Sequence, residues 1–306
     1  MSFTAEVKHE IARIKGEEIP ELAALIRMDG SIQIINKRLA LRIKIYLGDL
    51  ARRIYSLIKT QFNLDMQIMV RKDTHFHIKH NIYELYLAPQ PGLDNFLFAL
   101  GLLDEDRNLI FKIKEEFINN RSCQRAYIRG AFLGGGSVNN PNSEYHLEFR
   151  CEHISFAEDL IKLLAMFNIK GHLTEHNNKH IVYLKNFEDI TTILNIIGAH
   201  KALLKMEDKY IMKSLRNDTN RKVNFETANL DKTVEAAMLQ LEDIELIERK
   251  KGLKSLSKGL REIAILRKRN PYASLKELGN LLIPNLSKSG VNHRIRRIKK
   301  IADKLR

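Results

Sequence analysis

The sequence predicts an α+β protein in which an αββαββα pattern occurs twice and is followed by an all-α domain. Helical and alternating segments follow the same order over about residues 15–105 and 120–210. A stretch with four asparagines and no regular apolar period, residues 216–229, separates this region from a purely helical remainder. With 306 residues, the chain is long enough for two domains. We therefore expect a duplicated domain at 1–215, a linker at 216–229 and a helical domain at 230–306.

The first copy begins with a helical segment at residues 18–29, after which the apolar period shifts between about 2 and about 3.6 residues. Its other segments are alternation at 32–46, a helix at 48–62, alternation at 64–72 and 75–87, and a helix near 92–102. The side chains expected on the packed face are Leu39, Leu41, Ile43, Ile45, Leu64, Met66, Ile68 and Val70, opposite Arg42, Lys44, Tyr46, Asp65, Gln67 and Arg71. Such alternation predicts an antiparallel sheet with one packed face and one solvated face.

The second copy repeats this order of elements. Its segments are a helix at 121–133, a strand at 145–152, a helix at 155–167, strands near 169–175 and 180–184, and a helix at 187–197. The repetition predicts two half-domains of one fold within the first 215 residues.

Each copy opens with a helix that ends in small residues. The segments read LAALIRMDGS at residues 22–31 and IRGAFLGGGS at residues 128–137. Both resemble the signature helix of the LAGLIDADG homing endonucleases, with Gly30 aligned on Gly136 and Ser31 on Ser137. The small residues that would let two such helices pack backbone to backbone are Ala23, Ala24, Gly130 and Ala131. The resemblance implies a LAGLIDADG homing-endonuclease-like fold with the two helices at its seam.

The catalytic position of that family is only half present. In the nucleases, an acidic residue at the end of each motif holds divalent metal ions that activate water. Asp29 occupies this place in the first copy, but Gly135 occupies it in the second and has no side chain to ligate a metal. We expect Asp29 to be a vestigial acidic position, with no catalytic residue, no metal and no cofactor. A metal-dependent site-specific DNA endonuclease remains the enzymatic alternative.

Two further residue pairs have metal-ligating side chains but too few of them. His75 and His77 share one predicted strand face, as do Cys151 and His153. Without a third or fourth ligand, each pair favours a solvent-facing or core role over a metal site. The only two cysteines, Cys123 and Cys151, form no CxxC pair and fit a reduced, cytoplasmic protein.

The positive charge of the chain is concentrated at its C-terminal end. The net charge is +14, and residues 249–306 hold 18 Lys and Arg against three acidic residues, a net charge of +15. The preceding 248 residues hold 33 basic and 34 acidic side chains, a net charge of −1. Such a patch favours a polyphosphate partner, because each neutralised phosphate releases a counterion. An adaptor whose basic domain binds RNA or a membrane surface remains open on charge alone.

The C-terminal domain is expected to be a helix-turn-helix. Helices are predicted at 230–247 and from about Leu256 to Lys268, and Ser274 with Glu277 forms a capping-box pattern that opens a short third helix. Residues 283–290 form the turn, and we expect Ser289 to cap a last helix from Val291 to Leu305. We therefore place the helix-turn-helix from Ser274 to Arg306.

The last helix divides into an apolar stripe and a polar surface. The stripe consists of Val291, Ile295, Ile298, Ile301 and Leu305. A helix in the DNA major groove needs this division, with amides and guanidiniums near its N-terminus for base edges. The residues expected near bases or adjacent phosphates are Ser287, Ser289, Asn292, His293, Arg294 and Arg297. Phosphate contacts are expected from Arg296, Lys299 and Lys300, on a basic surface extended by Lys250, Lys251, Lys254, Lys258, Arg267, Lys268 and Arg269.

The duplicated domain is expected to bind DNA weakly. The solvated face of its first sheet would carry Arg42, Lys44, Arg71, His75, His77 and Lys79, whereas the second would carry His146, Glu148, Arg150 and Glu152. Because the domain is near neutral overall, we interpret it as a scaffold on which a partner regulatory protein docks.

Together these features resemble the WhiA family of bacterial regulators, in which a degenerate homing-endonuclease domain is fused to a C-terminal helix-turn-helix. The resemblance covers essentially the whole chain, including the start at residues 2–8 and the linker at 220–229. It implies a non-catalytic transcriptional regulator of cell division, chromosome segregation or sporulation. It also implies double-stranded DNA as the partner, a cytoplasmic, nucleoid-associated location and no membrane association.

Overall fold

In a computed structural model, which describes residues 2–73 and 80–306, the chain forms two compact units. The first ends at Met212 and the second begins at Lys213. Each unit has its own hydrophobic core.

The first copy contains one antiparallel sheet with the strand order β1-β2-β4-β3. Its elements are α2 (Glu18–Asp29), β1 (Gly30–Ile35), β2 (Arg38–Ile45), α3 (Gly48–Phe62), β3 (Gln67–Asp73), β4 (His80–Leu87) and α4 (Leu93–Ala99). Asn36 and Lys37 have φ angles of 50° and 63°, so the β1–β2 connection is a tight hairpin turn of two left-handed residues. The order of elements confirms the predicted αββαββα pattern.

The second copy repeats the topology, with the strand order β5-β6-β8-β7. Its elements are α5 (Arg121–Gly135), β5 (Gly136–Val138), β6 (Leu147–Cys151), α6 (Ile154–Ala165), β7 (His172–His176), β8 (Lys179–Leu184) and α7 (Phe187–Ile197). A short 3₁₀ turn, η1 (Glu115–Phe117), precedes it. Gly30 and Gly136 each begin the first strand of their copy, which matches the alignment made from the sequence.

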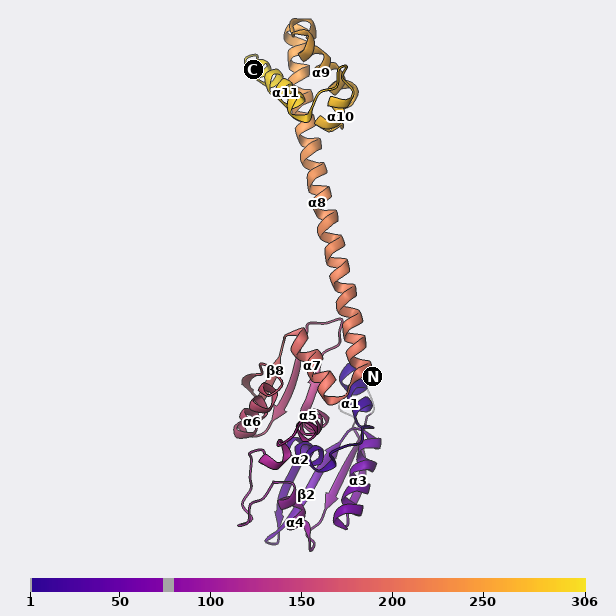
Figure 1. Cartoon of the computed structure of the whole chain (residues 1–306), viewed down its shortest axis with the longest axis vertical. Helices are drawn as coiled ribbons and strands as arrows, with labels where there is room; N and C mark the ends of the chain where they lie inside the picture. Colours follow the sequence, from indigo (N-terminus) through magenta and orange to yellow (C-terminus); the bar gives the residue numbers. More distant parts are fainter. Residues whose placement is uncertain (1, 74–79) are drawn as a thin grey trace. The chain divides into compact units, whose positions relative to one another are not determined.

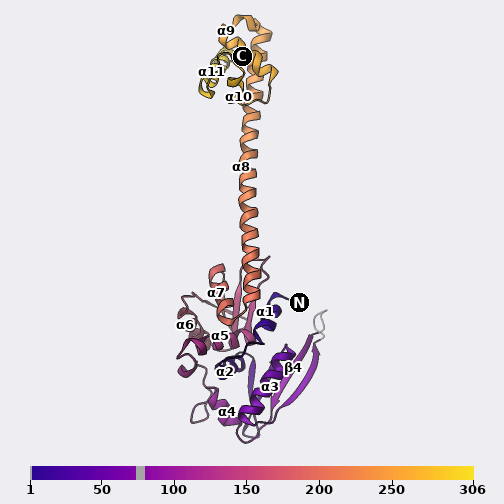
Figure 2. The ribbon, with the colours of Figure 1, turned by 45° about the vertical axis from the view of Figure 1, so that its right-hand side comes forward.

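Helices cover one face of each sheet. In the first copy α3 packs on β2 and β4, and in the second α6 packs on β6 and β8. Figure 1 shows α2 and α5 side by side between the two copies, and Figure 2 shows α3 lying along the sheet that contains β4. Among residues 2–73 and 80–306, no helix covers the opposite face of either sheet.

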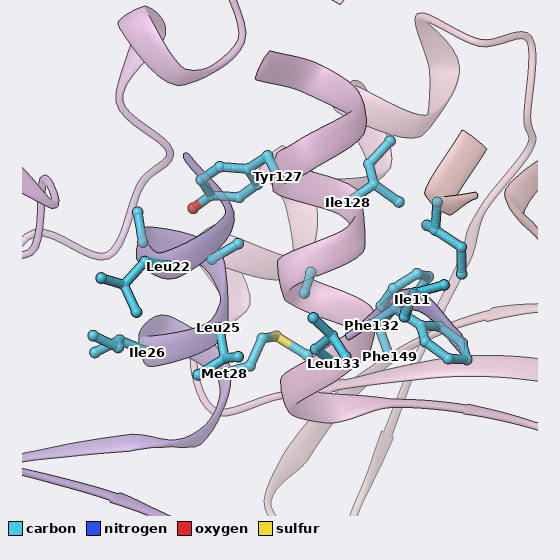
Figure 3. Packing of buried hydrophobic residues seen from close by; sticks show 14 of the residues in the cluster. Ile11, Leu22, Leu25, Ile26, Met28, Tyr127, Ile128, Phe132, Leu133 and Phe149 are labelled. Atoms are coloured by element: carbon cyan, nitrogen blue, oxygen red, sulfur yellow. The ribbon is translucent and has the colours of Figure 1, made fainter. Parts of the chain in front are cut away.

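Glycines on α5 let it approach the backbone of α2 closely. A Cβ on Gly130 would lie 2.0 Å from the Glu21 carbonyl oxygen, and one on Gly134 would lie 2.6 Å from the Met28 Cβ. Only glycine fits at both positions, so the small-residue seam expected from the sequence is present. Leu25 and Met28 of α2 face Leu133 of α5 across it (Figure 3).

An ionic cluster completes the seam. Glu21 on α2 is buried and accepts hydrogen bonds from Arg129 of α5 at 2.6 Å and from Arg53 of α3 at 2.8 Å. One carboxylate between two guanidiniums satisfies charges that would be costly to bury alone.

The N-terminal segment forms a further helix of the first unit. Helix α1 (Phe3–Ile11) buries Phe3, Val7 and Ile11, which recur at steps of four residues, and Ser2 caps it. The Glu10 carboxylate accepts hydrogen bonds from the backbone N–H groups of residues 201 and 202. Thus Glu10 of α1 also caps the start of α8 (His200–Lys251), the helix that follows α7.

One face of the first sheet differs from the prediction. Leu64 and Met66 precede β3, and Ile68 and Val70, expected on the packed face, are 42% and 57% exposed. The strand β3 lies at the sheet edge, with only β4 as a neighbour, so these two apolar side chains extend beyond the cover of α3.

Residues 216–229 lie within α8, and so does the helix expected at 230–247. All of 216–229 are exposed, which explains why the segment has no apolar period. Residues 200–251 contain no Gly or Pro, so nothing in the sequence interrupts the helical hydrogen bonds until Gly252, whose φ is 72°. The boundaries of the linker and of the two domains stay a prediction.

The second unit is all-helical. After the last turns of α8 come η2 (Leu253–Ser255), α9 (Lys258–Arg269), α10 (Leu275–Asn280) and α11 (Lys288–Asp303). They enclose one core, to which α8 contributes Ile244 and Ile247, and the others contribute Leu260, Ile263, Ala264, Leu278, Leu282, Val291, Ile295, Ile298 and Ala302. The expected capping box is formed, since Ser274 and Glu277 bond each other's backbone N–H groups at 3.3 and 2.7 Å.

The last helix begins earlier than expected. Ser287, not Ser289, is its N-cap, and the Ser287 hydroxyl accepts a hydrogen bond from the Gly290 N–H at 3.2 Å. The sequence offered two serines two residues apart, and only Ser287 has the extended backbone that places its hydroxyl over the N3 amide. The turn between α10 and α11 is correspondingly shorter, at residues 281–287.

Candidate nucleic-acid interface

Helix α11 presents a clean division between a buried and an exposed face. Val291, Ile295, Ile298 and Ala302 are buried and form the stripe that packs against α9 and α10. At about 100° per residue, the side chains at 289, 293, 296 and 300 lie on the opposite side of the helix. All four are exposed. The buried stripe therefore holds α11 in place while its polar face remains available.

Several side chains on the exposed face are free of partners. Arg296, Arg297 and Lys300 are exposed and make no ion pair or hydrogen bond with another described residue. His293 is likewise exposed, and Asn292 is half-buried at one edge of the face. A row of unpaired cations beside an amide and an imidazole can meet phosphates and base edges without first breaking protein contacts.

Three other residues that the sequence placed at the interface have partners within the protein. Arg294 donates a hydrogen bond to the Gly259 carbonyl at 3.1 Å, which ties α11 to the start of α9. Ser287 uses its hydroxyl as the N-cap. Lys299 interacts electrostatically with the buried Asp243, whose carboxylate also accepts a hydrogen bond from Arg306 at 2.7 Å. These contacts favour positioning roles for all three.

The expectation that Arg267 extends the basic surface is wrong. Its side chain is only 1% exposed, and its guanidinium donates to the carbonyl oxygens of Asn270, Pro271 and Ala273. Burial lowers the pKa of Arg267 below its usual value. Arg267 thus holds the turn between α9 and α10, whereas its neighbours Lys268 and Arg269 remain exposed.

On the uncovered face of the first sheet, two arginines already have a carboxylate partner, whereas Lys44 is exposed and makes no ion pair with another described residue. Glu84 on β4 is buried, and its carboxylate pairs with Arg42 of β2 and, at 3.4 Å, with Arg71 of β3. The sequence alone placed Arg42 and Arg71 on the solvated face, but it did not indicate Glu84 as their partner. The available signal was a single acidic residue among apolar and aromatic neighbours at residues 82–87, but its partners depend on strand register. His75, His77 and Lys79 lie outside the described residues.

The second sheet repeats this arrangement with different residues. Glu148 on β6 accepts hydrogen bonds from Arg150 at 2.8 Å and from His146 at 3.2 Å, and Glu152 pairs with Lys179. Although burial raises the pKa of Glu148, the bonds from His146 and Arg150 hold it below its usual value. Each of the two acidic residues that the sequence placed on this face therefore has a cation as its partner.

The two motif ends differ in space as well as in chemistry. Asp29 ends α2 and Gly135 ends α5, at equivalent places in the two copies. A Cβ on Gly135 would lie 2.3 Å from the Met28 Cε and 2.8 Å from the Arg150 carbonyl oxygen. The packing at this point leaves no room for a second carboxylate beside Asp29.

Asp29 is paired electrostatically with a lysine from α1. Burial raises the pKa of Asp29 to about 6, an effect that the charges of Lys8 and Lys44 oppose. Burial lowers the pKa of Lys8 to about 8, and Asp29 opposes that shift in turn. The Lys8 ammonium also donates a hydrogen bond to the Gly134 carbonyl at 3.1 Å. Lys8 thus places a cation between the ends of the two motif helices.

Within residues 2–73 and 80–306, no group of three or more His, Cys, Asp or Glu side chains is arranged to hold a metal ion. Cys151 is buried at the end of β6, and burial raises the pKa of its thiol to about 12. His153 lies beyond that strand and stacks on Phe111, with ring centroids 3.8 Å apart. The pair expected on one strand face is therefore separated. None of the helices so described is long and apolar enough to cross a membrane.

Three family models match the chain one after another. They are the WhiA N-terminal LAGLIDADG-like domain at residues 15–103, the WhiA LAGLIDADG-like domain at 124–216 and the WhiA C-terminal HTH domain at 219–302. These matches confirm the duplicated LAGLIDADG-like fold and the helix-turn-helix predicted from the sequence.

Similar proteins match over their whole length. A relative named probable cell division protein WhiA from Halothermothrix orenii is 63% identical and covers 100% of this chain and 99% of its own. One with the same name from Clostridium botulinum is 43% identical, with the same coverage. The crystal structure of full-length DUF199/WhiA from Thermatoga maritima superposes with a TM-score of 0.60 at 26% identity, covering 99% of both chains.

Proposed function

Because the chain belongs to the WhiA family, we propose that it is a non-catalytic DNA-binding regulator that acts in cell division through its helix-turn-helix. The names of its relatives support the process, and the helix-turn-helix supports duplex DNA as the partner. We further propose that it controls transcription on the nucleoid, with chromosome segregation or sporulation among the processes affected.

The observation that carries this proposal is the face of α11, where unpaired cations surround His293 opposite the buried stripe. A helix anchored on one side can lie in the major groove and direct the other side at the bases. We assign base contacts to Ser289, Asn292 and His293, near the helix N-terminus. We assign phosphate contacts to Arg296, Arg297 and Lys300, with Arg294, Ser287 and Lys299 holding the helix in position.

The same proposal gives the duplicated domain a role without chemistry. Its sheet arginines Arg42, Arg71 and Arg150 are paired with Glu84 and Glu148, and the position equivalent to Asp29 has no space for a second carboxylate. We therefore propose that it acts as a scaffold, on which a partner regulatory protein docks. Cleavage of supercoiled plasmid with magnesium or manganese, abolished by Asp29→Ala, would instead identify an endonuclease.

The decisive experiment measures binding of the full-length chain to duplex DNA across a salt series. Genomic fragments retained by the protein are selected first, and affinity for one of them is compared with that for a shuffled duplex. The double variant Arg296→Ala, Arg297→Ala should lose at least about tenfold in affinity, and the salt slope should fall by about two. The measurement is fluorescence anisotropy at each salt concentration.

A matched control removes two cations elsewhere. Lys15 and Lys170 are exposed and make no ion pair with another described residue, so Lys15→Ala, Lys170→Ala changes the net charge equally. This control should bind DNA as the unaltered protein does. Equal losses in both double variants would mean that net charge, and not the α11 face, supplies the affinity, which would contradict the proposal.

A further inference from the structure

A cavity of about 610 Å³ lies in the first unit beside Asp29. Its walls come from α1, from α2, from the end of β2 and the residues after it, from the start of α3 and from the end of α5. The residues that line it and matter for recognition are Lys8, Leu25, Asp29, Lys44, Leu47 and Leu133. Its volume falls in the range of about 300–1,000 Å³ that is typical of small-molecule sites.

Most of this lining is apolar. Leu25, Leu47 and Leu133 belong to the hydrophobic core of the unit, and they turn part of their surface toward the cavity. Ile45 and Leu50 extend the same wall. Such a surface favours a ligand with an apolar body, because each square ångström of apolar area removed from water contributes about 25 cal/mol.

The polar part of the lining carries more positive than negative charge. Lys8 and Lys44 supply two ammonium groups, and Asp29 supplies the only carboxylate among the lining residues. The Asp29 carboxylate accepts no hydrogen bond from any described residue, and Lys44 is exposed and makes no ion pair with one. Two cations beside one anion leave room for a single further negative charge.

We propose that this cavity binds a small monocarboxylate with an apolar body. The carboxylate of the ligand would lie between Lys8 and Lys44, and its apolar part would lie against Leu25, Leu47 and Leu133. A polyphosphate is disfavoured, because Asp29 would repel its additional charges and the apolar wall offers them no donors.

The test is isothermal titration of the full-length chain with three ligands of one chain length, namely octanoate, octan-1-ol and octylamine. Octanoate should bind saturably, with a stoichiometry of about one per chain. Octan-1-ol should bind several-fold more weakly, and octylamine should bind weakest, because its ammonium meets Lys8 and Lys44. Absence of saturable octanoate binding, or equal affinity for octylamine, would overturn the proposal.

Two substitutions in the cavity should change the affinity for octanoate in opposite directions. Lys44→Met removes an attractive charge and should weaken octanoate binding by about threefold to tenfold. Asp29→Asn removes a repulsive charge and should strengthen it by a similar factor. Lys15→Met, at an exposed lysine outside the cavity, should change nothing. Weaker octanoate binding in Asp29→Asn would show that Asp29 does not repel the ligand, which would contradict the proposed arrangement of charges.

Discussion

The exposed face of α11 and the uncovered faces of the two sheets carry similar cations, but the partners of those cations differ. On α11, Arg296, Arg297 and Lys300 extend into solvent without an ion pair among the described residues. On the sheets, the arginines surround buried carboxylates, Glu84 in the first copy and Glu148 in the second. The difference shows that the number of basic side chains on a surface does not by itself predict how well that surface binds phosphate.

The physical reason is the cost of exchanging one partner for another. An arginine that pairs with a buried carboxylate must leave that charge uncompensated before it can bind a phosphate, and the penalty for a buried unpaired charge is several kcal/mol. An arginine in solvent gives up only water and mobile ions.

Restoring the missing acid should damage the fold instead of reviving chemistry. Gly135→Asp would place a Cβ 2.8 Å from the Arg150 carbonyl oxygen, so we expect a loss of about 2–4 kcal/mol in the free energy of unfolding. Gly135→Ala serves as the control, because it adds the Cβ without the charge and should account for most of the loss. The measurement is urea unfolding, followed by a plasmid-cleavage assay. Metal-dependent cutting by Gly135→Asp would show that the space is adequate after all.

Replacing the buried cation of the second unit should loosen that unit. Arg267→Met leaves three carbonyl oxygens without their donor, so we expect a loss of about 2 kcal/mol in local stability. Hydrogen exchange of the α9–α11 amides in the full-length chain measures it. Arg269→Met, at an exposed arginine two residues along the same helix, is the matched control. Equal protection in both variants would place Arg267 among the ordinary surface cations.

Asp29 should make the first unit less stable as the pH rises. Burial raises its pKa from 3.8 to about 6, so between about pH 4 and pH 6 the folded chain holds more protons than the unfolded chain. The free energy of unfolding therefore falls through that window as the pH increases. Asp29→Asn should remove this fall and stabilise the unit by about 1–2 kcal/mol at pH 7, with little effect at pH 4.

Lys8 should affect the free energy of unfolding in a higher pH range than Asp29. Its pKa is lowered from 10.5 to about 8, so the unfolded chain holds more protons between these values and stability should rise with pH there. Hydrogen exchange of α2 and α5 amides at several pH values separates the two residues. A gain from Asp29→Asn that is independent of pH would show that the burial of a charge is not its cause.

Releasing the sheet arginines should give the smallest effect. Glu84→Gln removes the charge that holds Arg42 and Arg71, and we expect about twofold to fivefold tighter binding of duplex DNA at low salt. The measurement uses the Arg296→Ala, Arg297→Ala background, in which the contribution of α11 is reduced. Glu105→Gln changes the net charge equally at an exposed position and should not have this effect. A gain of the same size from both would mean that only total charge counts.

Within the second unit, the sequence was sufficient to predict the last helix and its division into two faces. Its apolar stripe, its capping serines and its basic surface are local patterns, and each depends on residues a few positions apart. The sequence could not distinguish Ser287 from Ser289 as the N-cap, because serine is favoured at that position in either case. The backbone conformation selects Ser287. The burial of Arg267 was also hidden, since its acceptors are carbonyl groups of the turn that follows α9.

The duplicated αββαββα order, the close α2–α5 seam and the loss of one acidic position could all be predicted from the sequence. These follow from periodicity and from small residues at fixed spacing, which are properties of short segments. Three findings required the tertiary structure: the Glu84 carboxylate pairs with two arginines, Gly135 has no space for a side chain, and Lys8 lies beside Asp29. Each of these joins residues from different elements, and strand register and helix approach bring such residues together in ways that no local pattern records.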